Sequence, residues 1–404
     1  MRCDQFTARI ILVRILVAES KWTGHHLFFA RSVAEALRSP DDEVILAVTA
    51  SKAAAPRRML EIATGNVTGA GVEVRRSLTG PEAGYARIGD RDGGIEVDTI
   101  SAEIAATRPD RVVVPSADAV GFFLGGRSTA PELLRSQATR LILHQPYVGY
   151  GGRGLRFALR REFIRHRLRK SVAGLAALDH RITRAMGPRH PVSILPNIPQ
   201  TDPVVSVADA RRRFGIDHDR PVFLAAGEHS QRKGTDRLVD AWPAESEGTL
   251  LIVGHCSEQV QSAVAKRPKD LDAGRIRIFD EVLDDPTHAK AFHACDVVTA
   301  CYQQHFGVSG ILHTAAQIER PILGSDYGYI GDCIRAFGLG STVDCRDSDA
   351  LAAALREGLR LPPTMDSIRS LPFREFHSAE SFRGHLRMWA LGTNGIDPPP
   401  APIP

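Results

Sequence analysis

Two basic side chains stand between two glycines in the second half of the chain. The segment reads Gly227-Glu-His-Ser-Gln-Arg-Lys-Gly234, so Arg232 and Lys233 directly precede a glycine at the predicted start of a helix. Fixed cations at such a place can stabilise the charge that builds up on a diphosphate leaving group. The alternative is a solvated basic pair at a helix cap.

A glycine-bounded turn further along predicts an anion site. Gly307 and Gly310 bracket Ser309, which can act as the N-cap of a helix predicted over 311–318. Unpaired N–H groups at a helix start, together with the helix dipole, attract negative charge. The turn therefore suits a phosphate or a diphosphate. An ordinary strand-to-helix turn of a parallel sheet is the alternative.

Polar residues also follow two predicted strands in the first half. His144 ends the run Leu141-Ile-Leu-His144, and Gly24 and His25 follow the first strand. The carboxyl ends of strands are where α/β folds bind ligands, so these residues either contact a ligand or serve as caps and structural histidines.

The segment Gly149-Tyr-Gly-Gly-Arg-Gly154, which includes Tyr150, matches a dinucleotide-binding pattern. It follows the fifth strand instead of the first and lacks the downstream acidic residue, so a flexible acceptor-side loop is favoured.

Strands and helices alternate along the whole chain. This alternation predicts an α/β fold, with two Rossmann-like doubly wound parallel-sheet domains that face a central cleft. The predicted strands of the first half cover 10–18, 43–48, 72–75, 111–115 and 141–144, with helices over 26–38 and 95–107 and a loop over 79–94. The predicted strands of the second half cover 221–226, 250–253, 275–279, 297–300, 321–323 and 341–343, with helices over 347–359 and 379–391.

The composition is that of a globular protein. Of the 404 residues, 43% are hydrophobic and 24% are charged, and the net charge is +4. The six cysteines are scattered without metal-ligand spacing, which favours free, buried thiols in a reducing compartment. The apolar run over 10–18 is too short to span a membrane and carries Arg14, so it is interpreted as the first strand.

A strongly basic segment follows the glycine-rich loop. Residues 153–170 contain eight Arg or Lys residues and one Glu, and an apolar stripe recurs at helical spacing at Leu155, Leu159, Phe163, Ile164 and Leu168. Such a helix can lie on anionic lipid headgroups. It can equally be a surface helix whose stripe packs on the domain core. Nucleic acid is not expected, since no aromatic platform accompanies the charge.

The motifs of the second half occur in an order that resembles the GT-B-fold glycosyltransferases, most of all glycosyltransferase family 4 (group 1). A Gly-to-Lys-Gly loop is followed by the strand end Ile252-Val-Gly254, the turn Phe306-Gly307, an Ala-rich helix before Pro321, and Ser325-Asp-Tyr-Gly328. The resemblance covers residues 221–359 well and the rest thinly.

The resemblance implies a set of site residues. His144, Arg232 and Lys233 would be the catalytic group, with His144 touching the donor sugar. Donor-binding residues would be Gly227, Gly254, His305, Phe306, Gly307, Val308, Ser309, Gly310 and His313. Gly24, His25 and Tyr150 would lie on the acceptor side.

The chain departs from the family at its paired glutamates. The first position holds Gln304, and the second falls at Leu312 or, aligned from Pro321, at Thr314. His305 or His313 could supply the missing hydrogen bonds. The loop is also altered, because Glu228 stands where the family carries an early Arg, and Arg232 could compensate.

The resemblance predicts transfer of a sugar from a nucleotide-diphosphate sugar to a glycan, lipid-linked or small-molecule acceptor, with retention of configuration and without a metal or cofactor. A catalytically degenerate nucleotide- or sugar-binding partner protein, or a sugar-nucleotide epimerase or hydrolase, remains an alternative. The expected location is cytoplasmic, with peripheral contact at the inner membrane face through 153–170. The expected domains are 1–198 (acceptor side), 199–372 (donor side), a helix over 373–392 that crosses back, and a disordered tail over 393–404.

Overall fold

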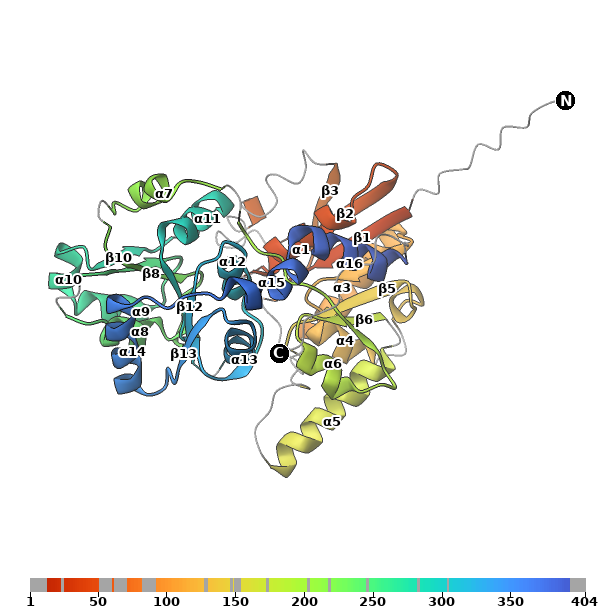
Figure 1. The fold of residues 1–404 in the computed structure, drawn as a ribbon. Helices are drawn as coiled ribbons and strands as arrows, with labels where there is room; N and C mark the ends of the chain where they lie inside the picture. The colour runs from red at the N-terminus through yellow and green to blue at the C-terminus, as the bar shows by residue number, and fades with distance from the viewer. Residues whose placement is uncertain are drawn as a thin grey trace. The chain divides into compact units, whose positions relative to one another are not determined.

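The computed structural model describes residues 13–22, 25–50, 60–61, 71–81, 92–126, 130–145, 148, 154–171, 174–201, 204–216, 219–244, 247–281, 284–303 and 305–392. These residues form two compact units (Figure 1). Unit 1 runs to Ala177 and also contains Arg181–Ser193 and the segment from Leu386. Unit 2 contains Leu178–His180 and Ile194–His385. The predicted tail, 393–404, lies outside the described residues.

Unit 1 is built on one seven-stranded sheet in the order β3-β2-β1-β4-β5-β6-β7. The strands are β1 (Val13–Glu19), β2 (Asp42–Thr49), β3 (Val72–Leu78), β4 (Arg111–Val114), β5 (Thr139–Leu143), β6 (Gly174–Ala177) and β7 (Val192–Ile194). The helices are α1 (His26–Leu37), α3 (Asp92–Thr107), α4 (Asp118–Leu124), α5 (Leu155–Lys170) and α6 (His180–Met186), with a 3-10 turn η2 (Leu133–Arg135). The pairs from β3 through β6 are parallel, so their carboxyl ends share one edge.

Unit 2 is built on a six-stranded sheet in the order β10-β9-β8-β11-β12-β13, parallel throughout. Its strands are β8 (Val222–Ala226), β9 (Thr249–Val253), β10 (Ile276–Phe279), β11 (Val297–Ala300), β12 (Ile322–Ser325) and β13 (Gly340–Val343). Its helices are α7 (Val207–Arg213), η3 (Gln231–Lys233), α8 (Thr235–Ala241), α9 (Glu258–Ala265), α10 (Pro268–Asp272), α11 (Asp285–Ala294), α12 (Gly310–Gln317), α13 (Gly328–Phe337), α14 (Ser348–Arg360) and α15 (Ser367–Phe376).

The strands of unit 2 are buried on both faces, which explains their continuous apolar runs. In β8, Leu224 and Ala226 join the core under α11, α12 and α13, while Phe223 and Ala225 join the core under α8, α9 and α14. Alternate residues therefore anchor helices on opposite faces. This double anchoring holds the carboxyl end of β8, at Ala226, in a fixed position.

The last helix, α16 (Ala379–Leu391), begins in unit 2 and ends in unit 1. Its C-terminal half is tied to unit 1 by backbone acceptors and a carboxylate. Arg387 donates to the Leu37 carbonyl at 2.5 Å and lies 3.4 Å from Asp42. The Trp389 carbonyl accepts from Arg140 at 2.8 Å.

The sequence analysis missed several short elements of unit 1, namely the strands β6 and β7, the helices α4 and α6 and the turn η2, and it placed the start of α3 too late. Strand β6 is Gly-Leu-Ala-Ala and strand β7 has three residues, so neither carries a strong β signal. The loop predicted over 79–94 ends earlier, because α3 begins at Asp92. Gly93 reads as a loop residue in sequence, yet a Cβ there would lie 2.6 Å from the Phe123 ring. Close packing between helices explains this glycine.

Candidate donor site in unit 2

The loop after β8 folds its lysine back onto the end of the strand. The ammonium of Lys233 donates to the Ala226 carbonyl at 2.7 Å. Gly227, with φ +92°, permits this approach, since a Cβ there would lie 2.8 Å from Lys233 Nζ. Gly234, with φ +66°, then starts α8. The two glycines predicted from the motif are therefore required by backbone conformation and by space.

Gly254, at the end of β9, is packed directly against this loop. A Cβ on Gly254 would lie 2.2 Å from the Gly227 carbonyl oxygen, and the residue has φ +124°. The ends of β8 and β9 can therefore approach closely only with glycine at this position. Gly254 shapes the loop through its lack of a side chain.

Backbone contacts join the same loop to the end of β11. The Gln303 N–H donates to the Arg232 carbonyl at 2.7 Å, and the Gln303 side chain donates to the Cys345 carbonyl at 2.8 Å. A Cβ on Gly234 would lie 2.6 Å from the Cys301 carbonyl oxygen. Gln303 was not singled out from the sequence, although its place directly after a buried strand was a usable signal.

Tyr302 is the central side chain of the site, and sequence reasoning missed it. Its ring centroid lies 5.3 Å from Lys233 Nζ and 5.8 Å from the Arg232 guanidinium carbon, within the range of a cation–π contact. Its hydroxyl lies 2.9 Å from the Ser309 hydroxyl. One buried ring therefore connects both predicted cations to the predicted anion turn.

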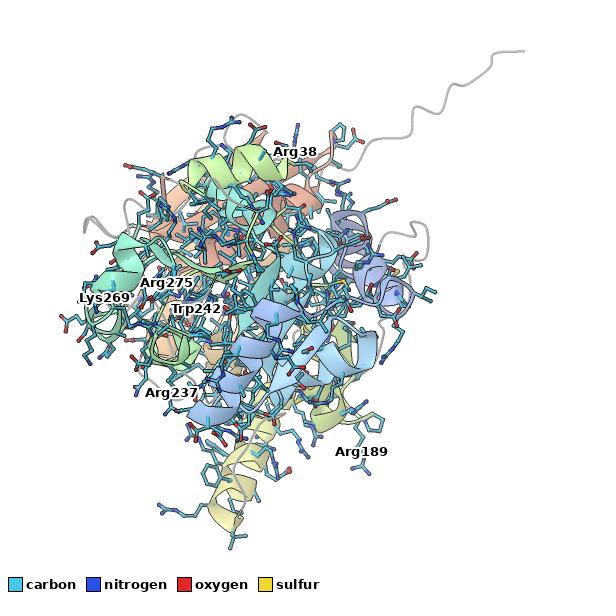
Figure 2. All side chains as sticks on the ribbon, turned by 60° about the vertical axis from the view of Figure 1, so that its left-hand side comes forward. Arg38, Arg189, Arg237, Trp242, Lys269 and Arg275 are labelled. Carbon is cyan, nitrogen blue, oxygen red and sulfur yellow. The ribbon has the colours of Figure 1, made fainter. Side chains whose placement is uncertain are left out.

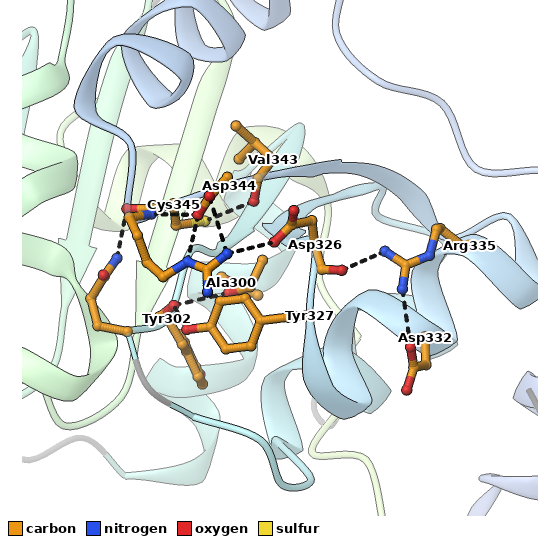
Figure 3. A network of polar contacts seen from close by, with 12 residues as sticks. Ala300, Tyr302, Asp326, Tyr327, Asp332, Arg335, Val343, Asp344 and Cys345 are labelled. Atoms are coloured by element: carbon orange, nitrogen blue, oxygen red, sulfur yellow. Dashed lines mark hydrogen bonds and ion pairs between the residues drawn. The ribbon is translucent and has the colours of Figure 1, made fainter. Parts of the chain in front are cut away.

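The backbone of Tyr302 is held by a network shown in Figure 3. Its carbonyl accepts hydrogen bonds from the Tyr327 hydroxyl at 2.7 Å and from the Ser325 hydroxyl at 3.0 Å. The Arg346 guanidinium lies 4.7 Å from the Tyr327 ring centroid and is itself paired with Asp344. Residues at the ends of β12 and β13 thus fix the position of Tyr302.

His305 bridges the cationic loop and the turn. Arg232 can only donate, so it donates from Nη1 to His305 Nδ1 at 3.0 Å. The other ring nitrogen, Nε2, then carries the proton and donates to the Val308 carbonyl at 3.3 Å. His305 is buried, whereas the neighbouring Phe306 is 50% exposed and lies 5.4 Å from the Tyr327 ring.

Helix α12 begins after Ser309, which is the predicted N-cap residue. Ser309 occupies the N-cap position without making a side-chain cap hydrogen bond, because its hydroxyl pairs with Tyr302 instead. The predicted N-cap position of Ser309 is therefore confirmed, and only the side-chain hydrogen bond that usually accompanies it is absent. Gly310 is exposed, and apart from its chain neighbours and the backbone of its own helix, no atom of the described residues lies within 4 Å of the place where its Cβ would be. With Gly307 and Val308, these residues form a turn whose N–H groups lead into a helix start.

His313 is held inside unit 2. It is 1% exposed, and Nδ1 lies 3.0 Å from the Ser309 carbonyl while Nε2 lies 3.3 Å from the Tyr329 hydroxyl. Burial lowers its pKa to about 3, so the ring is neutral. His313 thus stabilises the turn from inside unit 2, through its contact with the Ser309 carbonyl. Gln304, at the first family glutamate position, lies outside the described residues.

His229 is a second buried histidine that was not predicted. Its Nε2 donates to the Val253 carbonyl at 3.2 Å, and Nδ1 accepts from the Thr235 hydroxyl at 2.9 Å. Burial and the nearby Lys233 lower its pKa to about 3. With Lys233, Thr235 and Tyr302, it lines a small cavity at the end of β8. Because the His229 ring is neutral, Lys233 is the cationic side chain among the described residues that line this cavity.

The predicted residues of unit 1 lie at the carboxyl ends of β1 and β5. His144 follows β5 and is 8% exposed, and its Nδ1 lies 3.3 Å from His25 Nε2. Gly24 and Tyr150 lie outside the described residues.

A buried ion pair lies beside these histidines. Lys21 Nζ is 2.8 Å from Glu96 and donates to the Ser116 carbonyl, while its backbone N–H donates to Glu19. Burial raises the pKa of Glu19 to about 7 even though Lys21 opposes the shift. Burial would lower the pKa of Lys21, but Glu96 and Glu19 outweigh it, and that pKa is raised. This cluster was not predicted from the sequence.

Within the described part of the chain, no group of His, Cys, Asp and Glu side chains could hold a metal ion. The five described cysteines are buried and form no disulfide bond. No described helix has the length and apolar character needed to cross a membrane.

Part of unit 2 matches a known protein family. Residues 220–360 match the family model described as "Glycosyl transferases group 1". The chain contains a glycosyl transferase group 1 domain. The predicted resemblance to glycosyltransferases is thereby confirmed, and the matched segment of this domain begins just before β8 and ends with α14. No sequence among the curated proteins matches the chain.

Solved structures share the whole architecture. Sucrose-phosphate synthase from Thermosynechococcus elongatus has a TM-score of 0.61 at 16% identity, covering 93% of this chain and 94% of that chain. HepE from Anabaena, solved with UDP-glucose, has a TM-score of 0.58 at 14% identity, covering 93% and 98%. WaaG, a glycosyltransferase involved in lipopolysaccharide biosynthesis, has a TM-score of 0.58 at 15% identity, covering 94% and 96%. The chain therefore has the predicted GT-B fold.

Proposed function

We propose that the protein transfers a sugar from a nucleotide-diphosphate sugar to a hydroxyl-bearing acceptor. The observation that carries this proposal is the convergence of Arg232, Lys233 and the start of α12 around Tyr302. The matched glycosyltransferase domain contains all of these residues. A solved protein of similar fold contains UDP-glucose, and the same donor class suits this site.

The diphosphate would meet three sources of positive potential. Lys233 and Arg232 supply two fixed charges, and the open start of α12 supplies N–H groups and the helix dipole. Because an ammonium has three donors, Lys233 can keep its bond to Ala226 and still donate to a phosphate oxygen. His305 holds the Arg232 guanidinium in place. These contacts would lower the barrier to breaking the bond between the sugar and the diphosphate.

Retention of configuration and independence from metal belong to the proposal and follow from the family resemblance. Two measurements check them. Proton NMR of the product at early times would give the anomeric configuration, and excess chelator should leave the rate unchanged. An inverted product, or activity that requires added Mg²⁺, would refute the corresponding statement.

A second candidate function is a nucleotide-binding partner protein without turnover. It is favoured by α12, where neither position aligned with the second family glutamate carries a carboxylate. Leu312 is fully buried, and the Thr314 hydroxyl accepts from the Gln200 N–H at 3.1 Å. A protein that lost these carboxylates could keep its diphosphate site and lose catalysis. A sugar-nucleotide epimerase or hydrolase would instead act without any acceptor.

Calorimetry followed by a release assay separates these functions. The full chain would be titrated with UDP, GDP, ADP and TDP, and the sugar nucleotides of the best base would then be incubated with and without acceptor sugars. We expect binding, with nucleotide release that depends on the acceptor. Binding without release supports the partner protein, and release without acceptor supports the hydrolase or epimerase. Absence of binding for every nucleotide would refute the donor site.

We also propose that helix α5 contacts a membrane that carries the acceptor. Leu155, Phe157, Leu159 and Phe163 are each more than half exposed, while Ile164 and Leu168 pack into the core of unit 1. The predicted apolar stripe is therefore divided, with its first part in solvent and its last part buried. Helix α5 extends from the rest of unit 1 (Figure 1), and Figure 2 shows side chains projecting from it.

Charge supports the same contact. Seven Arg or Lys residues and one Glu lie on α5, and exposed Arg156 and Arg160 alternate with the exposed apolar side chains. Apolar insertion combined with attraction to anionic headgroups is the pattern of helices that lie on a membrane surface. A lipid-linked acceptor and a location at the inner face of a cytoplasmic membrane are the corresponding proposals.

A further inference from the structure

One ring nitrogen of His313 has two polar neighbours inside unit 2. Its Nδ1 lies 3.0 Å from the Ser309 carbonyl oxygen and 3.3 Å from the side-chain nitrogen of Asn197. A carbonyl oxygen can only accept a hydrogen bond and an amide nitrogen can only donate one, while a neutral imidazole nitrogen carries either a proton or a lone pair. Nδ1 can therefore bond to only one of these neighbours at a time.

The His313 ring is neutral and fixed in place, so the two arrangements differ in the position of one proton. Burial lowers the pKa of His313 to about 3. The Phe373 ring stacks on it with centroids 5.4 Å apart and an interplanar angle of 11°, and the His377 centroid lies 4.2 Å away. The Tyr329 hydroxyl, 3.3 Å from Nε2, can donate or accept, so it suits either tautomer.

The first neighbour belongs to the proposed diphosphate site. The Ser309 carbonyl and the Gly310 N–H are parts of one peptide unit, and Gly310 is the exposed first residue of α12. N–H groups at a helix start have no partner inside the helix and attract anions. A hydrogen bond received by the carbonyl polarises the peptide and makes its N–H a stronger donor. The Nδ1-protonated ring therefore strengthens the anion site without touching the ligand.

The second neighbour belongs to the segment through which the chain passes from unit 1 into unit 2. Asn197 is 9% exposed, and its backbone N–H donates to His377 Nδ1 at 2.9 Å. The Gln200 N–H donates to the Thr314 hydroxyl oxygen at 3.1 Å, so this connecting segment is bonded to α12 beside His313. The side-chain amide of Asn197 thus competes with the donor turn for one buried nitrogen.

We propose that His313 is a positioning residue for the donor diphosphate, which acts through the Ser309–Gly310 peptide, and that Asn197 opposes it by favouring the other tautomer. A diphosphate at the start of α12 selects the Nδ1-protonated ring, and the Asn197 amide selects the Nε2-protonated ring. Because such coupling is reciprocal, removal of the Asn197 amide strengthens anion binding. The inference rests on the proposed function for the nature of the anion. It gives His313 an indirect role where the family resemblance implied a contact with the donor.

Nitrogen-15 NMR of the histidine-labelled full chain tests the tautomers. Inorganic pyrophosphate is the probe, because it supplies a diphosphate without a base or a sugar. In the free protein we expect the His313 Nδ1 and Nε2 resonances to lie between the values of the two tautomers. Saturating pyrophosphate should move them towards the Nδ1-protonated ring. A ring that stays in one tautomer throughout overturns the proposal, and this measurement needs no variant.

Calorimetry with pyrophosphate tests the competition. Asn197→Leu should bind about twofold more tightly or better, because the apparent affinity scales with the fraction of molecules in the binding-competent tautomer. His313→Phe keeps the ring packing, should bind more weakly, and should make Asn197→Leu without effect. Thr314→Val loosens the same connecting segment without changing the neighbours of His313 Nδ1, so it should leave the affinity unchanged. An Asn197→Leu gain that is absent, that persists alongside His313→Phe, or that Thr314→Val reproduces overturns the proposal.

Binding and tautomer together separate the role of His313 from the donor site itself. Binding of pyrophosphate or of a nucleotide without a change of the His313 tautomer overturns this role and leaves the donor site intact. Absence of binding for pyrophosphate and for every nucleotide overturns both.

Discussion

Lys233 Nζ lies 5.3 Å from the centre of the Tyr302 ring and 2.7 Å from the Ala226 carbonyl oxygen. The ammonium is thus held between an aromatic face and a strand end, at the place where a diphosphate would need it. We expect Lys233→Ala to weaken UDP or GDP binding by at least about 1.5 kcal/mol, or roughly tenfold. Calorimetry with Lys266→Ala, an exposed lysine on the same unit, provides the control. Unchanged affinity in Lys233→Ala would refute the donor site.

The glycines and the lysine of this site were predicted from the sequence, but Tyr302 was not. Gly227, Gly234 and Gly254 were predicted because a position that needs a positive φ or a close backbone approach favours glycine, and a glycine is visible in the sequence itself. Lys233 was found because it directly precedes such a glycine. Tyr302 has no such trace, since its value comes from contacts with residues 69 or 70 positions earlier and 7 positions later.

The two doubly wound parallel sheets were predicted because alternating strands and helices carry strong periodic signals, and the GT-B assignment came from the order of the motifs in the second half. The short strands β6 and β7 were missed because small residues and short length give no period. Histidine roles were the hardest to predict. His313 and His144 looked like ligand contacts in sequence, but their ring nitrogens are bonded inside the fold. Whether a histidine can reach a ligand depends on its burial. The burial of a single side chain depends in turn on packing between segments that are distant in the sequence.

The hydrogen bond between Tyr302 and Ser309 should couple the cationic loop to the turn. We expect Tyr302→Phe and Ser309→Ala each to lower stability by about 1 kcal/mol, because each leaves a buried hydroxyl without its partner. The double variant should cost clearly less than the sum of the two. Urea unfolding of the four proteins measures this coupling. Simple additivity would show that the 2.9 Å contact does not contribute.

Glu19 should make stability depend on pH. Its pKa is raised from 4.5 to about 7 by burial, so folding favours the protonated form. Its contribution is fully present below pH 4.5 and is lost as the pH rises through about 7. We expect Glu19→Gln to be more stable than the parent above pH 7, by a few kcal/mol at most, and to lose this advantage at lower pH.

The measurement is the urea midpoint of both proteins between pH 5 and pH 8. Asp118, whose pKa burial raises to about 6, contributes in an overlapping window, so the difference between variant and parent is the quantity that isolates Glu19. Glu162→Gln on the exposed face of α5 serves as the control. A constant difference across this range would show that Glu19 is ionised in the folded protein throughout.

Charge reversal on α5 tests the membrane contact. We expect the parent protein to bind vesicles that contain anionic phospholipid, and the triple change of Arg160, Arg161 and Arg165 to Glu to abolish binding, since each basic residue near such a surface contributes about 1 kcal/mol. The matched control reverses Arg212, Arg356 and Arg360, which are exposed on unit 2. High salt should weaken parent binding without removing it, because the exposed Leu155, Phe157 and Leu159 still insert. If the parent does not bind, or if the control variant loses binding equally, α5 is not the docking element.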